Sequence, residues 1–250
     1  MISILMSCYN SKPEYLSDQL LSIFNQTEQD YELLVYNDGG TEYVKFMPGL
    51  HYFDEGHKGI AKAYDFLLSK AKGEYVCFCD HDDIWLPDKL EVEKKYLDDH
   101  PDVDCVFGWL EWFGDKNKVE TFSISDKEIS KELIFSQPIK NPTVMFRKDS
   151  FGRFDAPFDL CADFWFYSQN RHCHYHLIEQ VMVKYRRHAG EATKDKSVLR
   201  HNHALTIQRN LKNIGIDVIF EVCEQLDKFS PKFDPNIKQR VMRRINEMGK

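Results

Sequence analysis

Apolar and polar positions along the first hundred residues form blocks that predict strands and helices in alternation. Three short runs, residues 1–7, 31–36 and 75–79, are almost wholly apolar, which is typical of strands buried on both faces. Between these runs, hydrophobic residues recur at helical intervals within residues 11–24 and 59–73. Strands that alternate with helices predict right-handed crossovers and a mostly parallel α/β sheet.

Local signals indicate where the helices begin and end. Ser11 opens a capping-box pattern, and so does Ser125 farther along the chain. Gly73 is the expected C-cap of the second helix, and Pro87 is expected at the first position of the third.

The pattern changes after residue 100 and again near residue 196. Strand-like runs occupy residues 103–113, 143–146 and 181–188, whereas only helical patterns follow, over residues 197–213, 217–229 and 236–248. We therefore expect one α/β domain over residues 1–195, made of halves 1–100 and 101–195, and a C-terminal helical extension over residues 196–250.

Composition narrows the class of protein. A chain of 250 residues with 42% hydrophobic content can bury one good core and a modest annex. Its net charge of −7 argues against a nucleic-acid binder, which needs a basic surface. We find neither an apolar run of the ~18 residues that span a bilayer nor a signal-peptide pattern, so the expected location is the cytoplasm. The seven cysteines, two of them in an apolar strand, are expected to be reduced.

Polar side chains collect where the three apolar runs end. Residues 8–10 follow the first run, Asp38 the second, and Asp80, Asp82 and Asp83 the third. The carboxyl ends of parallel strands meet at one edge of a sheet, so these groups are expected to line one crevice. Three neighbouring carboxylates repel one another unless a cation neutralises them, which indicates a divalent metal site.

A carboxylate-bound Mg²⁺ or Mn²⁺ most often serves a phosphate ligand, because the ion completes its shell with phosphate and water. The sequence has no GxxxxGK[ST] loop, and no GxGxxG follows the first strand. These absences argue against a P-loop nucleotidase and a dinucleotide-binding protein. A diphosphate leaving group held through the metal fits the pattern.

Several segments together resemble a known family. MISILMSCYN, YELLVYNDGG and GIAKAYDFLLSKAKGEYVCFCDHDDIWLPDKLE are similar, in order and spacing, to the nucleotide-binding half of family 2 glycosyltransferases with the GT-A fold. The match spans residues 2–91. FCDHDDIW and the later YRRH resemble the rhamnosyltransferase-like bacterial branch, which builds surface polysaccharides. The implied fold is a Rossmann-like, mostly parallel mixed sheet flanked by helices.

The resemblance implies a site for a nucleoside-diphosphate sugar, with UDP or dTDP as the nucleotide. In it, Asp38 would hydrogen-bond the base, and Asp80 would reach the ribose or the metal. The implied nucleotide-sugar residues are Cys8, Tyr9, Asn10, Asp38, Lys58 and Asp80.

The resemblance also implies the catalytic groups. Asp82 would bind Mn²⁺ or Mg²⁺ with help from Asp80 and His188, and Asp83 would support them. Asp163 would be the base that deprotonates the acceptor hydroxyl. Beside it, the aromatics of 164–166 are expected to form a drier wall that raises its pKa.

The implied reaction is transfer of the sugar, with inversion, to a glycan or lipid-linked acceptor. One alternative is a sugar nucleotidyltransferase, although the Gly-rich basic loop expected of that class is absent after the first strand. Another is a nucleotide-sugar or glycan-binding module with degenerate catalysis, because Asn37, Tyr64 and Ala162 depart from the family pattern.

Two further features have a functional and a structural interpretation. His172, His174 and His176 alternate as on one strand face, which would suit zinc, but an ordinary polar face is favoured. The last stretch is basic and could contact an anionic membrane surface peripherally, against a slightly favoured solvated helix face. Its basic residues are Lys228, Lys232, Lys238, Arg240, Arg243, Arg244 and Lys250.

Overall fold

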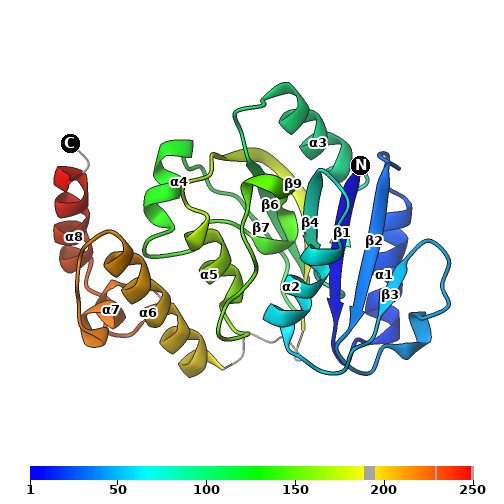
Figure 1. Cartoon of the computed structure of the whole chain (residues 1–250), viewed down its shortest axis with the longest axis horizontal. Helices are drawn as coiled ribbons and strands as arrows, with labels where there is room; N and C mark the ends of the chain where they lie inside the picture. Colours follow the sequence, from blue (N-terminus) through cyan, green and yellow to red (C-terminus); the bar gives the residue numbers. More distant parts are fainter. Residues whose placement is uncertain (189–194, 229, 249–250) are drawn as a thin grey trace.

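The computed structural model describes residues 1–188, 195–228 and 230–248, and one mixed sheet organises its first 187 residues (Figure 1). The strand order is β3-β2-β1-β4-β8-β6-β9-β5, and β7 pairs with β6. The strands are β1 (Ile2–Cys8), β2 (Tyr31–Asn37), β3 (His51–Phe53), β4 (Tyr75–Cys79), β5 (Ile84–Trp85), β6 (Cys105–Gly114), β7 (Lys118–Glu120), β8 (Met145–Arg147) and β9 (Tyr175–Arg187).

The predicted parallel sheet is confirmed for the first half of the chain. Strand β1 lies between β2 and β4 and runs parallel to both. Strand β8 is antiparallel to β4 and β6, so β4, β6 and β9 run in the same direction. The uninterrupted apolar runs supply both faces, because Leu5 and Phe78 point to one core while Ile4 and Cys77 point to the other.

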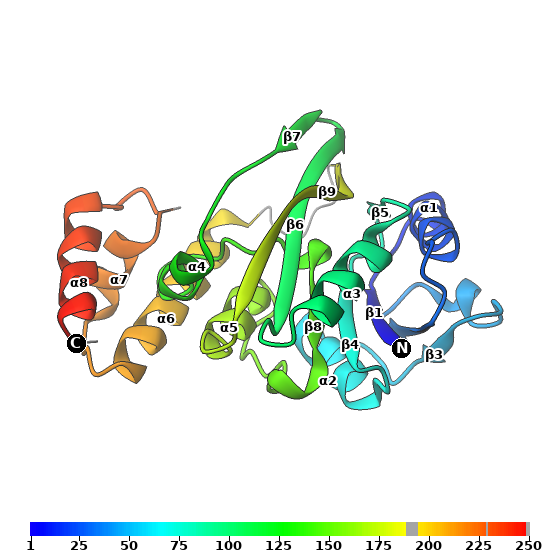
Figure 2. The same cartoon turned by 90° about the horizontal axis from the view of Figure 1, so that it is seen from above.

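Helices cover the two faces of this sheet (Figure 2). Helices α1 (Pro13–Phe24) and α3 (Lys89–Asp99) contribute to one core, and α2 (Ile60–Lys70), α4 (Asp126–Glu132) and α5 (Ala162–Gln169) to the other. Short 3₁₀ turns lie at Glu42–Val44, Asn141–Thr143 and Lys148–Ser150. The cysteines at all seven positions are buried free thiols.

Three C-terminal helices form a third packing unit at the end of the molecule farthest from β3 (Figures 1 and 2). They are α6 (Lys196–Asn213), α7 (Phe220–Leu226) and α8 (Pro235–Met248). Their core joins Ile207 and Leu226 to Cys161 and Phe164, so the extension packs directly on α5. Within the described residues, no helix is long and apolar enough to cross a membrane.

Some predicted helix ends are confirmed and others are wrong. The capping box at Ser125 is present. The one at Ser11 is wrong, because Ser11 is buried and α1 begins at Pro13 with Lys12 as its N-cap. Helix α2 is capped by Ala71 and not by Gly73.

Gly73 instead permits close packing of two chain segments. A Cβ atom there would lie 2.6 Å from the backbone nitrogen of Ser3, so only glycine lets this turn approach β1. The predicted helix start at Pro87 is wrong, because Pro87 lies in a turn closed by the amide of Lys89 and the carbonyl of Leu86 at 3.2 Å, and α3 begins at Lys89. The strand β5, which precedes this turn, was not predicted. The predicted helix end at Phe229 and the terminal Lys250 lie outside the described residues.

Candidate functional site

The loops after β1 and β2 are joined by backbone hydrogen bonds at the carboxyl edge of the sheet. The amide of Asp38 donates to the carbonyl of Cys8 at 2.7 Å, and the amide of Asn10 donates to Gly39 at 2.8 Å. Tyr9 is 52% exposed, and its ring centroid lies 4.9 Å from that of His57. Tyr9 and Asn10 are therefore exposed on one surface, on which an aromatic ring can stack with a base. The predicted contact of the Cys8 side chain with the nucleotide is wrong, because that side chain is fully buried in the sheet core.

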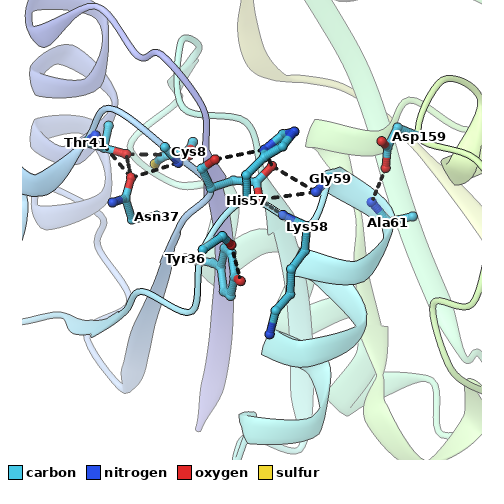
Figure 3. A network of polar contacts seen from close by, with 12 residues as sticks. Cys8, Tyr36, Asn37, Thr41, His57, Lys58, Gly59, Ala61 and Asp159 are labelled. Atoms are coloured by element: carbon cyan, nitrogen blue, oxygen red, sulfur yellow. Dashed lines mark hydrogen bonds and ion pairs between the residues drawn. The ribbon is translucent and has the colours of Figure 1, made fainter.

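Asp38 organises the turn that leads into α2, in which Figure 3 labels His57, Lys58 and Gly59. Its carboxylate is 3% exposed and accepts hydrogen bonds from the amides of Lys58, at 2.6 Å, and Gly59, at 3.2 Å. The same carboxylate lies 3.0 Å from Nδ1 of His57. Sequence reasoning missed His57, and only the folded turn brings it between Tyr9 and Asp38.

The Lys58 side chain lies away from these groups (Figure 3). Its ammonium pairs with Glu55 at 2.9 Å and lies over the rings of Tyr36 and Phe66. In this arrangement Lys58 contributes its backbone amide, not its charge, to the Asp38 turn.

Asn37 holds the loop in a place where the family more often has an acid. Its side-chain oxygen accepts hydrogen bonds from the amides of Gly39 and Thr41, both at 3.1 Å, while its amide donates to Asp54. Gly39 and Gly40 have φ values of 132° and 80°, which glycine adopts without strain. The departure at Asn37 is thus accommodated by a complete hydrogen-bond network.

The acidic loop after β4 is poor in hydrogen-bond donors. Burial, together with the charges of Asp82 and Asp163, raises the pKa of Asp80 to about 7. Burial raises the pKa of Asp83 well above its usual value, followed by the charges of Asp80 and Asp82. One oxygen of Asp83 accepts the amide of Arg186 at 2.9 Å, and the other is buried without a hydrogen-bond partner.

His188 reaches the acidic loop from the end of β9. Its Nε2 atom lies 2.9 Å from a carboxylate oxygen of Asp82, across 106 positions of sequence. The sequence-predicted pair of Asp82 and His188 is therefore brought together. A carboxylate and an imidazole are both ligands that Mn²⁺ accepts.

Arg186 and Tyr15 fix the acidic loop but were not identified from the sequence. The guanidinium of Arg186 donates to the backbone carbonyl of Asp82 at 2.8 Å and to Asp18 at 2.7 Å. It also stacks 4.2 Å from the centroid of Tyr15, whose ring lies 5.3 Å from that of His188. The YRRH segment was the available signal, since it places Arg186 two residues before His188.

Asp163 lies in the first turn of α5 and faces the acidic loop closely enough for its charge to raise the pKa of Asp80. Its carboxylate accepts hydrogen bonds from Gln137 Nε2 and from the amide of Phe164, each at 2.8 Å. The aromatic side chains of residues 164–166, which were expected to form one apolar surface beside Asp163, do not share a surface. Phe164 packs toward α6, Phe166 packs into the sheet core, and Trp165 lies against Arg209.

Asp159 ties the two halves of the domain together at the crevice (Figure 3). Its carboxylate accepts the amide of Ala61 at 3.1 Å, in the first turn of α2. A Cβ atom on Gly59, whose φ is 84°, would lie 2.3 Å from this carboxylate, so the turn needs glycine for two reasons.

Within the described residues, side chains do not form a metal-binding group by themselves, either at the acidic loop or elsewhere. Across residues 1–188, 195–228 and 230–248, no three His, Cys, Asp or Glu side chains are grouped to hold a metal by themselves. The three alternating histidines do not share a strand face, because β9 begins after His174. Of them, only His176 lies in the strand, where it pairs with Asp126 at 3.1 Å.

Comparison with known proteins identifies the family of the chain and its fold. The family model described as glycosyl transferase family 2 matches residues 3–170. An uncharacterized glycosyltransferase of Methanocaldococcus jannaschii is 26% identical over 74% of this chain and 70% of its own length. The Escherichia coli protein WfgD, named a UDP-Glc:α-D-GlcNAc-diphosphoundecaprenol β-1,3-glucosyltransferase, is 27% identical over 66% of this chain and 67% of its own.

Among solved structures, residues 1–349 of S. aureus TarS in complex with UDP-GlcNAc superpose with a TM-score of 0.62. The sequence identity is 17%, and the match covers 90% of this chain and 70% of the other. This likeness shows the GT-A fold.

Proposed function

Because this chain belongs to glycosyl transferase family 2, we propose that it is a metal-dependent, inverting enzyme with a nucleoside-diphosphate sugar as donor. The observation that carries this proposal is that Asp80 lies near Asp82 and Asp163: burial, and then the charges of these two acids, raise the pKa of Asp80 to about 7. Neighbouring carboxylates repel one another, so a cation bound between them would stabilise their charged forms.

The residues present suit a divalent cation. Asp82 and His188 are in contact, and Asp83 has a buried oxygen without a hydrogen-bond partner. Asp82, His188 and, from the preceding turn, Asp80 would hold Mn²⁺ or Mg²⁺, with Asp83 in support and diphosphate oxygens completing the shell. When bound, the cation would stabilise negative charge on the departing diphosphate.

The chain's own groups then have separate tasks. Tyr9 and the turn held by Asp38 receive the nucleotide base, and Asp80 faces the ribose. Asp163, oriented by Gln137, takes the proton of the acceptor hydroxyl as its oxygen bonds to the anomeric carbon. The bond from that carbon to the diphosphate oxygen breaks at the opposite side, so the configuration inverts.

The proposed domain boundaries follow from these separate roles. Residues 1–100 bind the donor, residues 101–195 bind the acceptor and carry the base, and residues 196–250 form the extension. The acceptor is a glycan or a lipid-linked sugar in bacterial surface polysaccharide synthesis, by analogy with the substrate in the name of WfgD. Such an acceptor places the enzyme at the cytoplasmic face of the membrane, which the basic helix α8 would contact peripherally.

A donor panel tests this proposal. Melting temperatures are measured with UDP-glucose, UDP-GlcNAc, dTDP-rhamnose and GDP-mannose, each with and without Mn²⁺, because a ligand of the native state raises its melting temperature. Turnover is then followed as nucleoside-diphosphate release with GlcNAc-diphosphate lipid and short glycans as acceptors. Tight donor binding with no turnover on any acceptor would favour a binding module, and NMR of the product checks inversion.

Asp163→Asn separates chemistry from binding. We expect transfer to fall by about 10²–10⁴-fold, which is the usual contribution of a general base, while the metal-dependent thermal shift with donor is kept. The matched control is Asp155→Asn, an exposed acid before the same helix. Transfer by Asp163→Asn at the rate of this control would assign the base to another residue.

A further inference from the structure

Helix α6 buries an unusual stripe of polar side chains. Asn202, Thr206 and Asn210 recur every four residues and are 6%, 0% and 2% exposed. A helix that only covers a hydrophobic core would present apolar residues at this spacing. Buried amides are costly unless they are hydrogen-bonded, so the contacts of this stripe are informative.

Two members of α6 hold the two ends of α5. Asn202 donates to the carbonyl of Leu160 at 2.9 Å, directly before Cys161, the N-cap residue. Arg209 donates to the hydroxyl of Ser168 at 2.6 Å and to the carbonyl of Trp165 at 3.3 Å. The entry and the last turn of α5 are therefore both attached to one helix of the extension.

Arg209 also stacks on α5. Its guanidinium carbon lies 3.8 Å from the centroid of the Trp165 ring, a cation–π arrangement that adds to the hydrogen bonds. The same guanidinium donates to the side-chain oxygen of Asn210 at 2.8 Å, which links Arg209 to the stripe.

The contact of Asn210 lies near Gln137, the residue that donates a hydrogen bond to Asp163. Asn210 donates to the carbonyls of Leu133 and Ile134, both at 3.1 Å, where the chain leaves α4. Three residues later, Gln137 donates to the carboxylate of Asp163. One helix thus holds both the helix that carries Asp163 and the segment that orients its carboxylate.

The Cys161 backbone shows why such support is needed. Cys161 has a φ of 73°, in the left-handed region that non-glycine residues rarely adopt. A strained residue persists only where the surroundings hold it, and it lies two positions before Asp163. The hydrogen bond from Asn202 to the neighbouring carbonyl of Leu160 is one polar contact that holds this turn.

We infer that α6 positions Asp163 for catalysis through Asn202, Arg209 and Asn210, which are positioning residues that make no contact with substrate. This inference rests on the proposed role of Asp163 as the base. The helical extension then contributes to catalysis by holding the part of the acceptor half that carries Asp163. A displacement of about 1 Å at a reacting group costs up to about 100-fold in rate.

The test uses the full-length chain with the active donor and acceptor from the panel above. Arg209→Met removes the guanidinium contacts but keeps an unbranched apolar stem. We expect kcat per folded molecule to fall about 10–100-fold, measured well below the melting temperature, while the donor KM and the Kd of the product nucleoside diphosphate with Mn²⁺ stay within about twofold. Arg209→Lys, which keeps one donor for Ser168, should recover part of kcat.

Lys212→Met is the matched control, because Lys212 is exposed on the same helix. Asn202→Ala tests the inference independently and replaces Arg209→Met if that variant does not fold. A kcat within twofold of wild type in the folded variant overturns the positioning role. If Asp163→Asn also retains transfer, the proposed base is wrong; if Asp163→Asn loses it, only the inference about α6 fails.

Discussion

The two acidic loops at the carboxyl edge of the sheet are built in opposite ways. After β2, both oxygens of Asp38 accept backbone amides of the following turn, and His57 lies beside them. After β4, the carboxylates lie near one another with few donors, and burial raises the pKa of both Asp80 and Asp83. Both loops follow parallel strands paired through β1, so strand position alone does not explain the difference.

The difference indicates two kinds of role. A carboxylate whose oxygens are filled by amides shapes its loop and has little capacity left for a cation. A group of carboxylates that lacks donors gains most from a cation, because each unpaired charge carries a desolvation cost. Under the proposed function, the loop after β2 would therefore be a scaffold for the nucleotide, and the loop after β4 would hold the metal.

Another buried carboxylate, Glu93 on α3, has a permanent cation as its partner. Removing that cation gives the largest expected effect on stability. Lys89 lies 2.7 Å from Glu93, and both side chains are fully buried. We expect Lys89→Met to lower the free energy of unfolding at pH 8 by about 3–5 kcal/mol, because it leaves a buried charge without its partner. Urea denaturation measures this value.

The pH dependence of that variant checks the cause. Burial raises the pKa of Glu93 to about 7 although Lys89 opposes the shift, so the folded protein holds a proton that the unfolded chain releases near pH 4.5. Stability of Lys89→Met should therefore fall as pH rises from 5 to 8. Lys95→Met on the same helix removes an exposed pair and should leave the free energy of unfolding nearly unchanged at both pH values. Equal losses in the two variants would contradict the assignment.

Removing one acid of the loop after β4 should act on the metal and not on the fold. We expect Asp82→Asn to lower Mn²⁺-dependent transfer about 100-fold, since the cation loses a carboxylate ligand that touches His188. The apparent Mn²⁺ affinity, taken from turnover against metal concentration, should weaken as well. The melting temperature without metal should stay unchanged or rise, because like charges are removed.

Asp99→Asn is the control for this substitution, as an exposed acid paired only at the surface. Asp82→Asn with the Mn²⁺ dependence of wild type would place the metal elsewhere and remove the contrast between the two loops.

The regular pattern of the first half was predictable because burial on both faces leaves a clear mark on a strand. The runs that became β1, β2 and β4 could be identified by their lack of polar alternation. Strand β5 could not, since it has two residues and is formed only by pairing with β9. Likewise, the glycine at position 73 is required by the approach of Ser3, a contact 70 positions away.

The residues of the candidate site also differ in whether the sequence alone could identify them. Acids that follow a strand were identifiable, because sequence order carries them to the edge of the sheet. Arg186, Gln137 and Asp159 were not, since each acts through a contact between segments far apart in sequence. The support of α5 by α6 also depends on tertiary contacts, and the buried amides of Asn202 and Asn210 look in sequence like ordinary surface residues.

The smallest expected effect comes from Asp38→Asn, which tests the scaffold side of the comparison. An asparagine keeps one oxygen for the amides of Lys58 and Gly59 but loses the carboxylate oxygen that lies 3.0 Å from Nδ1 of His57. We therefore expect a loss of about 1 kcal/mol in stability and less than tenfold in UDP affinity, measured by calorimetry with Mn²⁺. Glu55→Gln, on the same turn, is the control and should change neither. A loss of UDP affinity far above tenfold at unchanged stability would show that Asp38 binds the base directly, as the family resemblance implies, and that shaping the turn is secondary.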